Sequence, residues 1–359
     1  MYFNIENILY LYSFVALALI IYNIRELFLI NREKEKREYL VNKYNEEIKN
    51  KILSLKEEKQ IDESYINILA KELGKVDNLL AFRDAMVKNK DDRYIRLYKD
   101  IIYDSFVELS LHYSKKNDME KALFVYIIGV MEIERENSRR LDNIIINFLK
   151  NPSVYLVENT IKAFIKLGHK DSLIKTLNIL NFNGIYHNEK LVSDGLLEYR
   201  GNKLDLAKEL WEYRNEWMVS YVIAVIKFIR MIGCDFKEEF YNALKNENLN
   251  IEIKLELIRY FGKFKYDKVL DYMIDLFEKE DKVDRNFLIV ISTVLSSYPS
   301  KRTIEILKKG MTNSNWYIRN NSCSSFLSLK PSQDDINDIL NGKDRYAKEA
   351  LLYQLEKGD

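Results

Sequence analysis

The sequence predicts an all-α fold in which helical hairpins repeat along the chain and one transmembrane helix precedes them. Three observations support this fold class. Only 3 of the 359 residues are proline and 11 are glycine, so few helices are interrupted. Apolar side chains recur at helical spacing, at nearly constant intervals, through the C-terminal half. Residues 5–24 form one long apolar stretch near the N-terminus.

Charge and cysteine content exclude several classes of protein. The 56 Lys and Arg residues nearly balance the 55 Asp and Glu residues, so the global charge gives no argument for a nucleic-acid partner. The two cysteines, Cys234 and Cys323, are far apart in the sequence, have no metal-ligand spacing and define no disulfide scaffold. Cys323 lies among small residues of an expected helix, which favours a buried structural role.

The N-terminal segment, residues 1–30, is predicted to be a membrane anchor with its flank. Residues 5–24 are long enough to cross about 30 Å of hydrocarbon at about 1.5 Å per residue. Two alternatives remain, a cleaved signal peptide and the buried helix of a soluble protein. A signal peptide normally has basic residues before its apolar core, and this chain has none before Arg25.

The distribution of basic residues predicts the orientation of the anchor. None precedes the apolar stretch, and six follow it closely: Arg25, Arg32, Lys34, Lys36, Arg37 and Lys43. The positive-inside rule then places the chain in the cell membrane as a single-pass protein, N-terminus out and C-terminal domain in the cytoplasm. Interleaved glutamates make a solvated helix face as good an interpretation of this cluster as contact with anionic headgroups.

Residues 31–60 are expected to continue as a charged juxtamembrane helix. Its apolar side chains form one narrow stripe: Leu40, Tyr44, Ile48, Ile52 and Leu55. The stripe fits a coiled-coil seam, a docking face, or a stalk that lies on the first globular helix. Residues 61–151 are predicted to form an irregular helical-hairpin region, with Asp62 or Ser64 as its first cap and a hairpin over residues 93–136.

Residues 152–359 are predicted to hold the regular repeats, and Pro152 is expected to open their first helix. Apolar or small residues recur there in steps of four, four and three. The sets begin at Met218, Ile253, Phe287 and Ile318, and a truncated set begins at Ala347, so the intervals are 35, 34, 31 and 29 residues. An earlier set begins at Leu156. Intervals of this length are typical of helical-hairpin repeats.

Two segments resemble known helical repeats. The entry Trp316-Tyr-Ile-Arg319 of segment 315–329 resembles the second helix of a HEAT repeat. Met119 to Tyr126 resembles, more weakly, the second helix of a tetratricopeptide repeat. The HEAT resemblance implies a right-handed α-α superhelix, a solenoid whose extended surface usually holds proteins or peptides. Whether the N-terminal half is HEAT-like or tetratricopeptide-like stays open.

No motif in the sequence indicates catalysis. The only histidines, His112, His169 and His187, have no ligand spacing, and there is no phosphate-binding loop or nucleophile elbow. HEAT-like iron hydroxylases rely on repeated His-Glu pairs, which this chain lacks. We therefore expect no enzyme activity, no metal and no cofactor.

Aromatic and arginine residues are the candidate protein-binding residues. Trp211, Arg214 and Trp217 would form an exposed anchor patch of the kind found in protein interfaces, or else pack in the core. Trp316 and Arg319 open the HEAT-like helix. The resemblance implies that Arg319 bonds within or between repeats.

These features together predict a membrane-tethered cytoplasmic scaffold or adaptor that binds a protein partner, itself associated with the membrane. HEAT proteins with one N-terminal span occur in bacterial envelope and polysaccharide systems, which the resemblance offers as an analogy. Two other functions remain open. One is a HEAT-like enzyme (lyase, hydrolase or glycosylase) with an unrecognised site, and the other is a secreted solenoid if the N-terminus is cleaved.

Overall fold

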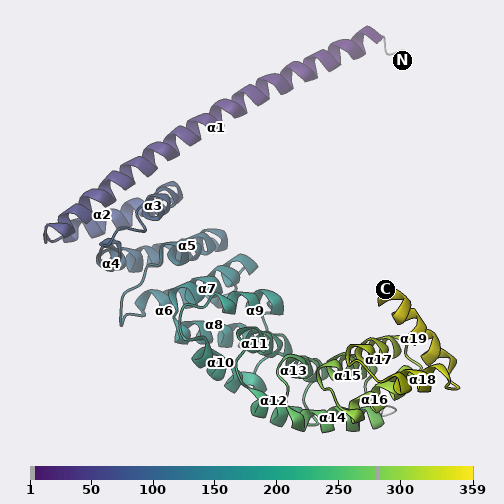
Figure 1. The fold of residues 1–359 in the computed structure, drawn as a ribbon. Helices are drawn as coiled ribbons and strands as arrows, with labels where there is room; N and C mark the ends of the chain where they lie inside the picture. The colour runs from purple at the N-terminus through teal and green to yellow at the C-terminus, as the bar shows by residue number, and fades with distance from the viewer. Residues whose placement is uncertain (1–4, 280–282, 359) are drawn as a thin grey trace. The chain divides into compact units, whose positions relative to one another are not determined.

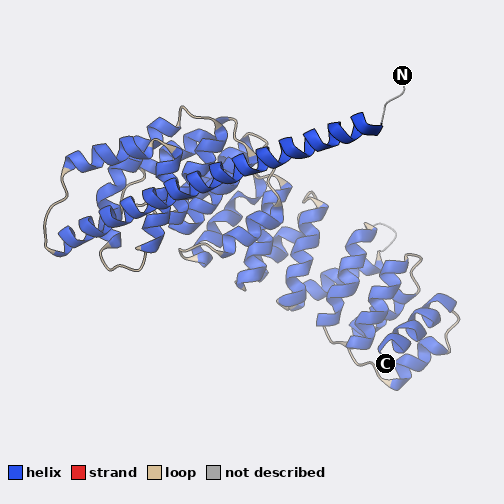
Figure 2. Cartoon of the chain, turned by 90° about the horizontal axis from the view of Figure 1, so that it is seen from above, coloured by secondary structure: helices blue, strands red, loops and turns tan. Residues whose placement is uncertain are grey.

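The structure is a computed structural model that describes residues 5–279 and 283–358 (Figure 1). Within these residues all regular secondary structure is helical, and the one β-bridge joins Arg135 to Ser138 in a loop (Figure 2). The all-α prediction is therefore confirmed. The first four residues of the expected anchor segment lie outside the described residues. The chain divides into two compact units, Met1–Leu177 and Asn178–Asp359.

The helices of the first unit pack in two interleaved rows. α1 contacts α3, α3 contacts α5 and α5 contacts α7, while α2 contacts α4 and α4 contacts α6. Each helix thus covers the apolar face of the helix two positions further along the chain. The helices are α1 (Ile5–Lys56), α2 (Glu63–Leu73), α3 (Val76–Lys88), α4 (Ile95–Tyr113), α5 (Asp118–Met131), α6 (Arg140–Asn147) with a 3₁₀ turn at Phe148–Lys150, and α7 (Val154–Leu167).

The second unit has the same contact order. α9, α11, α13, α15, α17 and α19 each contact the next member of that row. The boundary between the units falls inside α8 (Lys170–Phe182). The further helices are α9 (Glu189–Leu197), α10 (Lys203–Glu212), α11 (Val219–Ile232), α12 (Lys237–Leu244), α13 (Ile251–Lys263), α14 (Asp267–Glu278), α15 (Arg285–Val294), α16 (Lys301–Met311), α17 (Trp316–Ser328), α18 (Gln333–Leu340) and α19 (Arg345–Gly358), with 3₁₀ turns at Tyr213–Asn215 and Leu295–Ser297.

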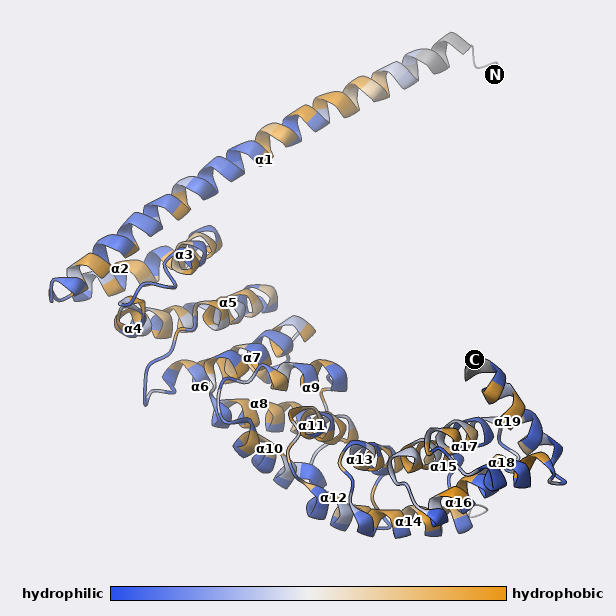
Figure 3. Cartoon of the chain, in the orientation of Figure 1, coloured by the Kyte–Doolittle hydropathy of each residue, from blue (hydrophilic) through white to orange (hydrophobic). Residues whose placement is uncertain are grey.

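α1 changes character along its length. From Tyr12 to Ile30 the helix is exposed and mostly apolar (Figure 3), and it is long and apolar enough to span a membrane; a membrane anchor and a signal sequence both have this property. A buried core helix does not expose its apolar side chains in this way, so that alternative is wrong. Further along, the stripe from Tyr44 to Leu55 is buried, and the Tyr44 ring meets Phe82 of α3 edge-on at 5.5 Å. The stalk interpretation of the stripe is confirmed, because it lies on the first helices of its own unit.

Local boundaries follow the capping chemistry. The Asp62 side chain accepts a hydrogen bond from the Ser64 backbone and caps α2, as expected. The expectation that Pro152 opens a helix is wrong, because Ser153 is the cap of α7 and Pro152 precedes it. The Ser153 hydroxyl accepts from the Leu156 amide, so the helix begins at Val154, two residues later than a start at Pro152 would place it. The second helix of the 93–136 hairpin ends at Met131, since Glu132 adopts a left-handed conformation with φ of 54°.

The apolar steps predicted in the C-terminal half point into the core of the second unit. The central members of each set are buried, for example Val222 and Ile226 in α11, Leu257 and Phe261 in α13, and Ile291 in α15. Cys323 is fully buried in α17, as expected. The last position of the truncated set, Leu355, is 39% exposed on α19.

Candidate protein-binding surfaces

Of the two interpretations of the Trp211–Trp217 segment, the structure supports packing of the tryptophans in the core and not an exposed patch. The side chains of Trp211 and Trp217 are only 4% and 7% exposed. Trp217 stacks on Tyr213 at 5.2 Å, and its indole nitrogen donates to the Asn178 side chain at 2.6 Å. Trp211 packs against Phe240 of α12. Core packing therefore holds both tryptophans, because each ring lies between neighbouring helices of the second unit.

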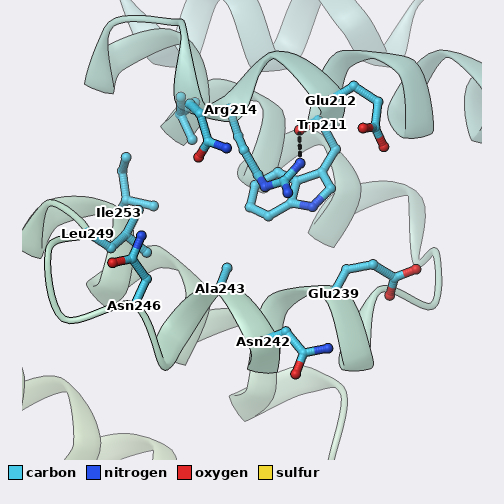
Figure 4. Close-up of a pocket in the computed structure, with 11 residues that line it drawn as sticks. Trp211, Glu212, Arg214, Glu239, Asn242, Ala243, Asn246, Leu249 and Ile253 are labelled. Atoms are coloured by element: carbon cyan, nitrogen blue, oxygen red, sulfur yellow. Dashed lines mark hydrogen bonds between the residues drawn. The ribbon is translucent and has the colours of Figure 1, made fainter.

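Arg214 lies at a pocket of about 390 Å³ beside these tryptophans. Its guanidinium lies 5.2 Å from the centre of the Trp211 ring and donates to the Trp211 carbonyl, and Asn242, Ala243 and Asn246 face it across the pocket (Figure 4). The carboxylates of Glu212 and Glu239 are exposed at the rim. Arginine thus covers the tryptophan, and the pocket offers side-chain amides and carboxylates that can hold a polar segment of a partner.

The second predicted pair, Trp316 and Arg319, does lie on the surface. Trp316 is 56% exposed at the start of α17, and two tyrosines of α19 stand beside it, Tyr346 at 62% and Tyr353 at 54%. These three rings and Arg319 line a shallow pocket of about 150 Å³. Tyr317 extends the cluster, with its ring 5.0 Å from that of Trp316. We call this set, Trp316, Tyr317, Arg319, Tyr346 and Tyr353, the aromatic patch.

Arg319 holds the aromatic patch together. It donates to the carbonyl oxygens of Asn313 and Ser314, both at 2.9 Å, in the turn before α17. Its guanidinium also lies 5.1 Å from the centre of the Tyr346 ring, a cation–π contact between α17 and α19. Arg319 therefore bonds to the turn before its own helix and contacts a ring of the next helix in the same row. The sequence alone did not reveal the two tyrosines, because they are about 30 residues from Trp316 and meet it only through helix packing.

A buried polar network in the first unit was also invisible in the sequence. His169, between α7 and α8, contacts the Asp142 carboxylate at 2.7 Å and the Glu134 carboxylate at 3.2 Å. Ser172 donates to Asp142 at 2.6 Å. Burial opposes protonation of the imidazole, but the bonds to both carboxylates outweigh this effect and raise the pKa of His169 above its usual value.

The His169 network is not arranged for nucleophilic catalysis. A serine nucleophile needs the histidine as its base, whereas the Ser172 hydroxyl bonds Asp142 and both nitrogens of the imidazole face carboxylates. Asp142 is 3% exposed, so no substrate reaches this carboxylate. Among residues 5–279 and 283–358, no group of three or more His, Cys, Asp or Glu side chains is placed to hold a metal ion.

Comparison with known proteins finds no protein family that matches the chain and no curated protein with significant similarity to it.

Proposed function

We propose that this chain is a single-pass membrane protein whose helical hairpins form a HEAT-like scaffold for a protein partner in the cytoplasm. The observation that most directly supports this proposal is the way α1 is built. Its exposed apolar half continues without a break into the stripe that is buried against α3. A helix built in this way tethers the helical units to a bilayer, and the basic residues that follow the apolar half favour N-out, C-in insertion.

Helix packing supports the solenoid part of the proposal. In each unit a helix covers the helix two positions further along, which is the nearest-neighbour burial on which repeat arrays depend. The recurring positions in α11, α13, α15 and α17 supply the buried contacts. We therefore keep the HEAT-like right-handed superhelix as the architecture, with the bonds that Arg319 makes to the preceding turn as its most specific local support.

The aromatic patch is the proposed partner surface. Tryptophan, tyrosine and arginine are the residues that most often dominate the free energy of protein association. A pocket of about 150 Å³ is smaller than ordinary ligand sites, which measure about 300–1,000 Å³, and this difference favours a protein side chain as the occupant. Confinement to a membrane favours a partner that is itself membrane-associated.

Site-specific photo-crosslinking in native membranes tests this function. A photoreactive amino acid replaces Tyr346 of the full chain, and the matched control carries it at Tyr186, a tyrosine of similar exposure (66%) elsewhere in the same unit. We expect one discrete crosslinked protein from position 346 and none from position 186. The same crosslinked protein should be lost in Trp316→Ala. Crosslinking that is equal at both positions, or absent from both, contradicts the proposed surface.

A further inference from the structure

Three turns of the first unit lie together at one end of its helices. The α2–α3 turn meets the C-terminal end of α4, since a Cβ on Gly74 would lie 3.6 Å from the imidazole of His112. The α6–α7 turn meets the α4–α5 turn, because the Ser153 amide donates to the Asp118 carboxylate at 2.7 Å. We call this end, residues 71–77, 111–120 and 148–155, the turn face.

The turn face points toward the apolar half of α1. Later residues of α1 contact later residues of the α3 segment: Lys36 pairs with Asp77 at 2.6 Å, and Asn45 bonds Asn89 at 2.8 Å. The two helices therefore run in the same direction, and the first turn of α3 is its part nearest to the apolar segment. Figure 1 shows α1 leaving the unit in the direction to which the α3 and α5 ends on this side point.

The turn face combines exposed lysines that form no close ion pair among the described residues with exposed apolar side chains. Its acidic residues are all engaged: Glu72 pairs with Lys43, Asp77 with Lys36, Asp118 with Lys121 and Glu120 with Lys116. Four of its lysines are exposed and have no ion-pair partner among the described residues: Lys71, Lys75, Lys115 and Lys150. The exposed apolar side chains are Leu111, Met119, Val154 and Tyr155, between 54% and 69% exposed.

The distance along α1 fits contact with a bilayer. Lys36 lies six positions beyond Ile30, the last apolar residue before the charged segment of α1, and a helix rises about 9 Å over six positions. The headgroup layer extends about 5–8 Å beyond the hydrocarbon on each side, and attraction to its charge reaches about a Debye length of 8–10 Å further. A long lysine side chain on the turn face covers the remaining gap.

We propose that the turn face lies against the anionic headgroups of the leaflet that α1 enters, with its lysines on lipid phosphates and carboxylates and with Val154 and Tyr155 at the hydrocarbon boundary. The proposal rests on the membrane insertion of α1 in the proposed function. A lipid surface fits better than a protein partner, because lysine is depleted in protein interfaces while juxtamembrane lysines are attracted to the anionic cytoplasmic leaflet. Tyrosine is a residue that membrane interfaces favour.

Lysine footprinting of the full chain tests the contact. The protein is reconstituted into nanodiscs of phosphatidylcholine alone or enriched in phosphatidylserine, and amine labelling of each lysine is read by mass spectrometry. We expect labelling of Lys75, Lys115 and Lys150 to fall about fivefold in the anionic discs, the factor that corresponds to the attraction of one lysine for such a surface. High salt should restore the labelling. Lys88 and Lys90, exposed at the opposite end of α3, are internal controls and should not change.

A pair of matched variants completes the test. Lys75→Gln/Lys115→Gln should abolish the protection of Lys150 by anionic lipid, whereas Lys88→Gln/Lys90→Gln should leave it as in the wild type. Equal labelling in neutral and anionic discs overturns the lipid proposal, and so does protection that appears only when a soluble protein is added. Flotation of the full chain with liposomes reports insertion of α1 separately. A chain that floats and crosslinks from position 346 but shows no lysine protection therefore refutes the turn-face contact alone.

Discussion

Replacing His169 by glutamine is expected to destabilise the first unit by about 3 kcal/mol, because the imidazole makes two hydrogen bonds to carboxylates and bonds of this kind contribute about 1.5–3 kcal/mol each. The Glu134 side chain is 40% exposed, so solvent screening reduces its share. Most of the loss comes from Asp142, which stays buried and keeps the hydrogen bond from Ser172 at 2.6 Å and the Arg139 guanidinium at 3.9 Å.

The cost of the His169→Gln substitution should depend on pH. The pKa of His169 is raised in the fold, so its stabilising contribution is fully present below the pKa of the unfolded chain, about 6.5. That contribution is lost as the pH rises through the higher pKa of the folded state. The difference in unfolding free energy between wild type and variant should therefore be larger at about pH 6 than at about pH 9.

Hydrogen exchange of the full chain in detergent measures this effect locally, through the protection of α6 and α8 at both pH values. His112→Gln is the matched control, since His112 is exposed and makes no ion pair among the described residues. The reasoning is refuted if His169→Gln changes protection no more than His112→Gln, or if its cost is the same at both pH values.

Three further predictions follow from burial, capping and charge. Phe261→Ala should cost about 3–5 kcal/mol in thermal or denaturant unfolding, because the ring is fully buried; a neutral result would show that α13 faces another way. Asp62→Ala should increase hydrogen exchange in the first turn of α2, whose Ser64 amide it caps, with Asp62→Asn as the near-neutral control. A reporter that works only in the cytoplasm should be active when fused at the C-terminus; activity of an export-dependent reporter there would reverse the topology.

Short sequence patterns predicted the features that depend on residues close together in the chain, such as apolar stretches and helix caps. The apolar stretch and the stripe both occur in one helix, and residues 12–24 are exposed while the stripe from Tyr44 to Leu55 is buried, as their patterns indicated. The cap at Asp62 is present as expected. These features depend on residues within one or two turns of each other, which a single sequence displays directly.

The binding surface depended on contacts that one sequence does not display. Trp211 and Trp217 have the composition of an interface, but their neighbours Phe240 and Asn178 come from other helices and cover them. Conversely, Trp316 gains Tyr346 and Tyr353 because α17 and α19 belong to the same row of helices. Residue type alone does not decide whether an aromatic ring lies in the core or on the surface. That depends on whether a neighbouring helix of the fold covers the ring.

The construction of α1 gives the two proposed membrane contacts of the first unit, the apolar half of α1 and the turn face, one geometric cause. The helix has neither proline nor glycine between Ile5 and Lys56, so no residue in it favours a kink or a hinge. The direction in which its apolar half enters a bilayer therefore determines the direction in which the first unit faces. Because the first turn of α3 lies beside Lys36, that direction brings the turn face toward the headgroups. A flexible glycine linker inserted after Ile30 would keep the anchor and the fold but remove this constraint. Lysine protection by anionic lipid should then fall, whereas crosslinking from position 346 should persist.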